Sequence, residues 1–340
     1  IRYRKDDMQM FKDRMARAMI EPLINKVLHD LKNDPERSLR NVVDLILSFP
    51  NGRFSNNMFE MLQKMLTNEN SAYYTLINKI VSYLDMENLK EFSINAGYNA
   101  CTSGAKTIRE LSRKNNCYIP WILLIETDKQ HSKQTADIIK QAKELGIYMF
   151  AVIDNDVSEE TAEIIRVNNE CAFVLFTEAS SVSDRTIAMF EDIKNVLASI
   201  HGTKDELSSA TDALRENHKF FAVHDFYDDE NCHSVFTEEK LNYFGDYTET
   251  FLFCMPTRKC SQETLDYMSS NSKKVRDEQK HSYVMMDVYN DTLTIDKMIS
   301  GNNFSAIIDV EGNLYSNKED GTKYNINDMP LLDVLKKYQK

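Results

Sequence analysis

Acidic and histidine side chains recur at the ends of apolar, strand-like segments through the middle of the chain. The candidate ligand-binding residues are Glu126, Asp154, Glu178, His201, Asp225 and Asp287, and His224 stands beside Asp225. If the strands are parallel, their carboxyl ends meet at one edge, where such groups could bind a cation or a basic ligand. The alternative is that these residues cap helices and face solvent at loop ends.

A second group of polar residues spans Ser103 to Arg109 and includes Lys106. Free amides at a helix start, together with the two cationic side chains, could bind a phosphate or another anion. The same pattern also fits a Ser103 hydroxyl that only caps a helix whose basic residues are solvated.

Metal and nucleophile chemistry have little support in the spacing. The one local group of metal-ligand residue types is His218, His224, Cys232 and His233, with Asp228, Asp229 and Glu230 between them. Zinc ligands usually stand about two to five residues apart, so we expect no metal site. The six cysteines contain no Cys-x-x-Cys pair and are expected to be mostly buried free thiols. No Gly-x-Ser-x-Gly elbow is present, and no catalytic residue is assigned.

The elements that must position these residues alternate between strand and helix from Trp121 onward. Strands are predicted over 121–127, 147–154, 172–177, 195–201, 219–225, 249–255 and 282–288, with helices over 134–145, 159–167, 184–193, 204–217, 238–244 and 262–280. Repeated units of this kind favour right-handed crossovers and a parallel sheet. A hairpin over 304–316, turning at 311–313, and a helix over 331–338 end the pattern.

The first part of the chain is helical in pattern. Segments 41–49, 57–66 and 73–84 have apolar residues at helical spacing, and we expect them to pack on the barrel and to offer a docking surface. The predicted organisation is therefore a helical region over 1–92, a connecting helix and lead-in over 93–120, a barrel over 121–290, and a hairpin with a helix over 291–340.

Composition excludes several classes of protein. The 340 residues carry a net charge of −12, which disfavours a nucleic-acid role because phosphate binding needs a basic surface. No apolar run approaches the roughly 18 residues of a membrane span, and the charged amino end favours a cytoplasmic protein. The scattered glycines form neither a dinucleotide-binding nor a P-loop motif.

Three segments carry a resemblance to a known family. They are 95–124, with Asn95-Ala-Gly-Tyr-Asn and Tyr118-Ile-Pro-Trp-Ile-Leu-Leu124, then Lys143-Glu-Leu-Gly-Ile-Tyr148, and then the hairpin from Phe304 to Asn317. Together with the order of elements, they resemble the radical SAM superfamily over nearly the whole chain. The resemblance implies an α/β fold: a partial (β/α)6 TIM-like barrel with an N-terminal all-α region and a C-terminal β-hairpin plus helix, the remnant of a SPASM-like tail.

The chain departs from this family at three functional positions. The family's Cys-x-x-x-Cys-x-x-Cys motif belongs in the loop after the first strand, but residues 128–133 contain no cysteine, and thiolates are what iron–sulfur clusters require. Asp154-Asn-Asp-Val157 replaces the family's Gly-Gly-Glu-Pro segment, and Tyr315-Ser-Asn317 stands where relatives usually place a cysteine. We therefore expect neither a 4Fe-4S cluster nor S-adenosylmethionine, and no other cofactor.

The leading hypothesis is a non-catalytic radical-SAM-like protein that acts as a binding partner or regulator of another enzyme. Its expected partner is a protein, either an active radical SAM enzyme or a peptide, and neither nucleic acid nor membrane. The alternative is an enzyme with replaced chemistry, or a small-molecule sensor, that uses the acidic residues at the barrel mouth. The short loop over 128–133 also predicts that the mouth above the first strand is partly closed or filled.

Overall fold

The computed structural model describes residues 70–257, 260–316 and 324–339, residue 68, and residues 21–22, 24–31 and 37. The helices predicted over 41–49 and 57–66 lie outside the described residues. The helix predicted over 73–84 is confirmed as α4 (Ala72–Tyr83). In the described part of the chain, no helix combines the length and apolar character that crossing a membrane requires.

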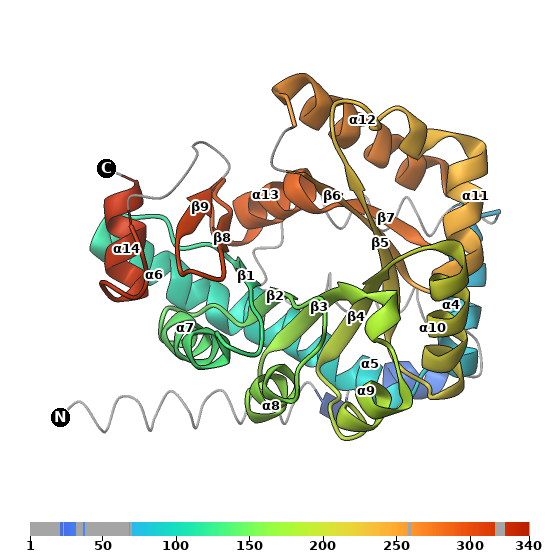
Figure 1. The fold of residues 1–340 in the computed structure, drawn as a ribbon, viewed down its shortest axis with the longest axis horizontal. Helices are drawn as coiled ribbons and strands as arrows, with labels where there is room; N and C mark the ends of the chain where they lie inside the picture. The colour runs from blue at the N-terminus through green and yellow to red at the C-terminus, as the bar shows by residue number, and fades with distance from the viewer. Residues whose placement is uncertain are drawn as a thin grey trace.

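The centre of the molecule is one curled, mainly parallel sheet (Figure 1). Strands β1 (Ile122–Glu126), β2 (Met149–Ile153), β3 (Ala172–Glu178), β4 (Val196–His201), β5 (Phe221–Tyr227), β6 (Phe251–Pro256) and β7 (Val284–Asp287) pair in parallel in chain order. The next strand, β8 (Ala306–Ile308), pairs in parallel with β1, and β9 (Leu314–Ser316) runs antiparallel to β8. The predicted α/β partial-barrel fold with a terminal hairpin is confirmed.

The strands form because nearly all of their residues are buried on both faces, as is usual for parallel sheets. Alternate residues serve two cores. Leu124 and Val174 pack in one apolar cluster, and their neighbours Leu123 and Phe173 pack in the other. Because β1 to β7 are parallel, their carboxyl ends lie together at one edge of the sheet.

Helices α7 (Ser132–Glu144), α8 (Glu159–Val167), α9 (Asp184–Met189), α10 (Lys204–Glu216), α11 (Glu238–Tyr247) and α12 (Gln262–Glu278) follow β1 to β6 in turn. Their starts are encoded locally. Ser158, Ser183, Thr237 and Ser261 each accept a backbone N–H bond from the first turn of the helix that follows. Figure 1 shows these helices arranged around the outside of the sheet.

Two features of the carboxyl-terminal part were not predicted from the sequence. Residues 288–299 form helix α13 (Val288–Ile299), and β8 extends the barrel sheet beside β1. The buried carboxylate of Asp296 accepts the backbone N–H of Trp121 at 2.9 Å and that of Phe304 at 3.1 Å. One side chain of α13 therefore fixes the start of both strands. The final helix, α14 (Leu331–Tyr338), lies where the sequence predicts it.

The amino ends of the strands are covered by a continuous helical segment made of α5 (Met86–Ser93), the π-helical η1 (Ile94–Gly104) and α6 (Ala105–Asn115). Asn95 is fully buried in it and donates to the backbone oxygens of Asn169, at 2.7 Å, and Cys171, at 3.0 Å. Gly104 allows close approach, because a Cβ there would lie 2.3 Å from the Gly146 backbone oxygen. This segment seals one end of the barrel.

The buried Asn95 amide generates a stability prediction. Asn95→Ala removes the donor to the Asn169 oxygen and one of the donors to the Cys171 oxygen. We expect the free energy of unfolding in urea to fall by about 1–3 kcal/mol, because the Asn169 carbonyl loses the Asn95 donor and the Cys171 carbonyl keeps only that of Asn195. Asn217→Ala is the matched control, since that exposed amide bonds only within its own helix, and it should cost less than about 0.5 kcal/mol. Equal losses in the two variants would contradict a sealing role for Asn95.

Candidate functional site

A cleft of about 920 Å³ opens at the carboxyl ends of the strands. Its apolar lining comes from Ile153, Val157, Phe176, Met189, Phe226, Met255 and Val310. A neighbouring cleft of about 740 Å³ shares Glu126, Ile153, Phe226 and Met255 with it, so the two are continuous across the mouth. The volume of the first cleft lies within the range of about 300–1,000 Å³ that is common for ligand sites. The prediction that the mouth above the first strand is partly closed or filled is therefore wrong.

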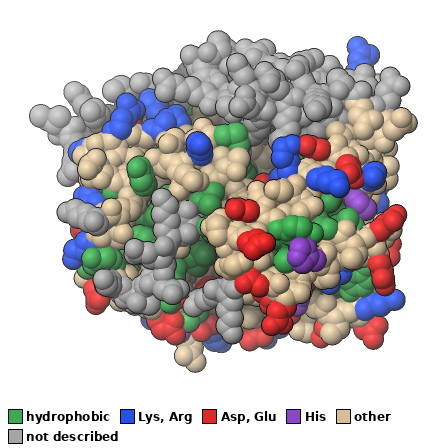
Figure 2. Space-filling model, turned by 90° about the horizontal axis from the view of Figure 1, so that it is seen from above, with side chains coloured by type: hydrophobic (Ala, Val, Ile, Leu, Met, Phe, Trp, Pro, Cys, Tyr) green, Lys and Arg blue, Asp and Glu red, His purple; other side chains and the backbone are tan. Residues whose placement is uncertain are grey.

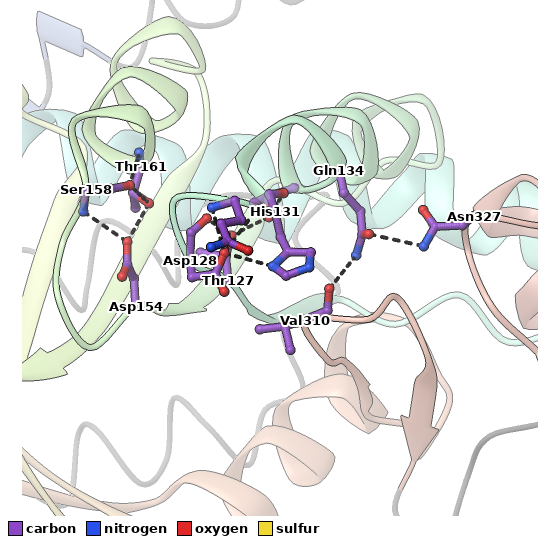
Figure 3. A network of polar contacts seen from close by, with 11 residues as sticks. Thr127, Asp128, His131, Gln134, Asp154, Ser158, Thr161, Val310 and Asn327 are labelled. Carbon is purple, nitrogen blue, oxygen red and sulfur yellow. Dashed lines mark hydrogen bonds and ion pairs between the residues drawn. The ribbon is translucent and has the colours of Figure 1, made fainter.

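The loop after β1 is a tight turn that its own hydrogen bonds close (Figure 3). Asp128 accepts the backbone N–H groups of Gln130, at 2.7 Å, and His131, at 2.9 Å, and lies 2.8 Å from the His131 Nδ1 atom. Slight burial opposes ionisation of Asp128, but these contacts with His131 outweigh it and hold the pKa of Asp128 below its usual range. The carboxylate serves the turn.

The loop after β2 depends on Asp154, which is only 2% exposed. Its carboxylate accepts from the Thr161 hydroxyl at 2.5 Å and from the backbone N–H of Ser158 at 3.2 Å. Figure 3 shows all three residues turned toward one another. Val157, inside this loop, has φ of +44°, a strained conformation for a β-branched residue. Asp154 is therefore neither the N-cap of α8, which is Ser158, nor a solvated loop end, and its carboxylate serves the structure of this loop.

Glu178, His201 and Asp225 form one charged cluster that adjoins the cleft. The His201 Nδ1 atom lies 3.5 Å from a Glu178 oxygen, and its Nε2 atom lies 3.6 Å from an Asp225 oxygen. Lys240 on α11 lies 3.1 Å from the other Asp225 oxygen. The contact with Asp225 raises the pKa of His201 against the effect of burial, and Glu178 adds to the rise. The strand ends therefore bring together three of the six predicted residues.

His224, on the cleft wall, has the opposite environment. It is 3% exposed, and its ring packs edge-on against Phe176 and Phe226. Burial, and then the nearby His201 charge, lower the pKa of His224 to about 3. The Ser199 hydroxyl lies 3.2 Å from the His224 Nδ1 atom, but Ser199 is fully buried and cannot reach a substrate. This pair is structural and not a nucleophile with its base.

Asp287 is fully buried beneath the mouth and lines neither cleft. It accepts from the Tyr227 hydroxyl at 2.9 Å and from the Asn290 amide at 2.6 Å. Burial raises the pKa of Asp287 even though both hydrogen bonds oppose the rise. Glu126, in contrast, lines both clefts. The predicted acidic set is therefore divided between cleft wall and core.

The predicted anion site at Ser103 has no helix start. Ser103 lies inside the continuous helical segment, and the residue before α6, Gly104, is itself helical and makes no side-chain cap. Arg109 donates to the backbone oxygen of Ile299 at 2.6 Å, which joins α6 to α13. Both interpretations of Ser103, as an anion ligand at a helix start and as a cap, fail for this reason, and Lys106 is left on the same helix without the amides such a site needs.

The histidine and cysteine group near β5 is not gathered into a site. His218 precedes β5 and bonds to the Tyr83 backbone oxygen, whereas Cys232 and His233 follow the strand's other end, where His233 packs on Tyr267. No group of His, Cys, Asp and Glu within the described ranges could hold a metal ion.

Sequence reasoning missed the residues that give the cleft its apolar floor and the cation that lies beside Asp225. Phe226 and Met255 lie in both clefts, and Phe226 is 37% exposed, which is unusual for a large apolar side chain. The strand predicted to end at Asp225 continues to Tyr227. The aromatic pair that follows Asp225 was the available signal. Lys240 lies on a helix whose position only the fold reveals.

The residues after β1 do not fit an iron–sulfur cluster. Oxygen, nitrogen and backbone groups fill the turn, and a cluster needs thiolates. The described cysteines lie elsewhere: Cys254 is buried within β6, and Cys260 donates to the Tyr227 backbone oxygen. Burial raises the pKa of both thiols, which disfavours the thiolate form.

Comparison with known proteins adds only distant structural likenesses. No protein-family model and no curated protein matches the chain. The crystal structure of Streptococcus suis SuiB is 11% identical, with 66% of this chain and 68% of that chain covered and a TM-score of 0.49. SuiB bound to precursor peptide SuiA is 11% identical, with 66% of this chain and 67% of that chain covered and a TM-score of 0.45. The tryptophan synthase A-subunit of Pyrococcus furiosus is 12% identical, with 64% of this chain and 94% of that chain covered and a TM-score of 0.41. These values are too low to support an argument about activity.

The environment of His224 predicts a pH dependence of stability. Because the folded-state pKa is lowered to about 3 from 6.5, protons bind the unfolded chain first as the pH falls through 6.5. The neutral His224 should therefore cost about 2 kcal/mol of stability at about pH 5. His224→Gln should flatten the fall in unfolding free energy between about pH 6.5 and 5 by that amount, whatever its absolute stability. An unchanged slope would contradict the buried, neutral state.

Proposed function

We propose that this protein is a non-catalytic, radical-SAM-like barrel that acts by binding a ligand in its strand-end cleft, as a partner or regulator of another enzyme. One observation carries the proposal: the mouth keeps a cleft of about 920 Å³, while the loop after β1 satisfies its own polar groups. A binding cavity is present without the ligand set that radical chemistry in this family needs.

The lining of the cleft favours a cationic ligand with an apolar body. Acidic residues on the wall are Glu126, Asp128, Asp154, Asp156, Glu159, Glu160 and Glu178, against two basic residues, Lys129 and Arg185. The two basic side chains pair with two of these carboxylates, since Lys129 lies 3.7 Å from Glu160 and Arg185 lies 2.7 Å from Glu159, and the remaining wall is acidic. Figure 2 shows one face of the molecule, on which acidic side chains lie near a histidine and apolar side chains.

The apolar floor of the cleft suits the apolar body of such a ligand. The exposed Phe226 ring and the Met255 side chain give an apolar surface on which an organic cation can rest, and aromatic faces attract cations. A protein or peptide partner that presents a lysine or arginine side chain would meet the same requirement. The ligand class we propose is therefore an organic cation, either free or carried by such a partner.

The proposed function predicts that neither cofactor binds. Expressed anaerobically with iron and sulfide, the protein should remain colourless, because the turn after β1 lacks thiolates. Calorimetry should give no saturable S-adenosylmethionine binding below about millimolar concentration, since the iron anchor and the second-strand turn are both replaced. A broad absorbance near about 400 nm with about four irons per chain would refute the non-catalytic assignment.

The second prediction tests the ligand class with benzyltrimethylammonium, whose charge does not depend on pH. It should bind saturably by calorimetry, and benzoate, of similar size and opposite charge, should not. Phe226→Ala and Glu126→Gln should each weaken binding by about twofold to fivefold, which corresponds to a cation–π or charge contact worth roughly 0.5–1 kcal/mol.

Asp212→Asn is the control for that experiment, because this exposed carboxylate on α10 bonds only with Arg215 and does not line the cleft. Equal effects of Asp212→Asn and Glu126→Gln would show that net charge, and not the cleft, attracts the probe.

A further inference from the structure

His201 stands between two carboxylates from the strands on either side of β4. Glu178 ends β3 and is in register with His201, while Asp225 belongs to β5. The two nitrogen–oxygen distances, 3.5 Å and 3.6 Å, are nearly equal. The side chains are 33% exposed for His201, 41% for Glu178 and 18% for Asp225. The imidazole is therefore shared between a cleft residue and a more buried one.

At these distances both carboxylates are within ion-pair range of the ring, although the His201 Nδ1 atom has no hydrogen-bond partner among the described residues. Two carboxylates that flank one ring favour its charged form. An imidazolium carries N–H donors on both nitrogens, whereas a neutral imidazole has one donor and one lone pair. After deprotonation, one of the two carboxylates faces a lone pair and loses its attraction. Asp225 keeps Lys240 at 3.1 Å. Glu178 is the more exposed carboxylate and already lines the cleft, so it is the one that leaves.

We propose that His201 controls the availability of Glu178 to the cleft ligand, holding this carboxylate when protonated and releasing it toward the cleft when neutral. The inference rests on the proposed function for the ligand itself, but the exchange between His201 and Glu178 does not. A cation in the cleft is then bound more tightly as the pH rises, and Glu178 is a recognition residue whose contribution depends on pH.

The groups around His201 support this control. Glu178 on β3 and Asp225 on β5 favour the imidazolium, and Lys240 on α11 lies beyond Asp225. On α10, the Glu206 carboxylate accepts the Thr203 backbone N–H at 2.8 Å, which fixes it at the helix start.

The two remaining histidines near the mouth are distinguishable from His201. With a pKa lowered to about 3 by burial, His224 stays neutral across the physiological range. His131 is paired with Asp128 in the β1 loop, so it requires a control variant. Contact with Asp225 and the Glu178 charge raise the pKa of His201 above its ordinary value, in the opposite direction to that of His224.

The first experiment follows the imidazole and carboxylate signals of the full chain by NMR between about pH 5 and 9. The side-chain carboxyl carbon of Glu178 should show an inflection at the pKa of His201, and Glu178→Gln should lower that pKa. His131→Gln should leave both unchanged. A His201 pKa that is the same in Glu178→Gln as in the unaltered protein would overturn the exchange.

The second experiment measures benzyltrimethylammonium binding at about pH 5.5 and about pH 9. The unaltered protein and His131→Gln should bind about threefold to fivefold more tightly at the higher pH. His201→Gln should show the tighter affinity at both pH values, and Glu178→Gln the weaker affinity at both. A His201→Gln variant that keeps the full pH dependence would overturn the control of the cleft. Absence of probe binding at every pH would overturn the proposed function, while the NMR titration still decides the exchange.

Discussion

The closure of the amino ends of the strands by one helical segment is the constraint on which the rest of the structure depends. A curled parallel sheet has two open ends, and polar backbone groups at a buried end must find partners. Asn95 supplies them to the start of β3, and Gly104 lets the helix approach the turn before β2. With that end filled, the opposite end is left as the place where a cleft can form.

At the open end, burial decides which polar side chains remain available. Asp154 and His224 come from the same strand ends as Glu178 and His201, yet hydrogen bonds occupy the first and desolvation neutralises the second. Adjacent residues on β5 differ in the same way, because His224 points into the aromatic cluster and Asp225 toward Lys240. Alternation along a strand therefore produces both an inert wall and a charged one.

The sequence predicts the parallel strands well because burial on both faces leaves apolar runs such as residues 122–125, and helix starts such as Ser158 carry their own caps. It does not predict α13, whose polar residues include the buried Asp296 that clamps two distant strands. Nor could it place β8 beside β1, or the ring of Phe226 in the mouth, since both depend on contacts between residues far apart in the chain. The candidate site was identified by strand ends, and its division into buried and available groups required the fold.

The cleft and the first loop are physically separable, and this separation gives the proposed function its logic. The loop after β1 is closed by contacts within Asp128–His131, so its structure does not require a bound group. The cleft, in contrast, is built from side chains at the ends of several strands and from Val310 in the hairpin. The cavity therefore does not depend on what the loop after β1 binds, because barrel mouths tolerate loop changes while their strands keep the scaffold. What the cavity then selects is set by the charges on its wall, and the inferred exchange with His201, 3.5 Å away, would make the contribution of Glu178 depend on pH.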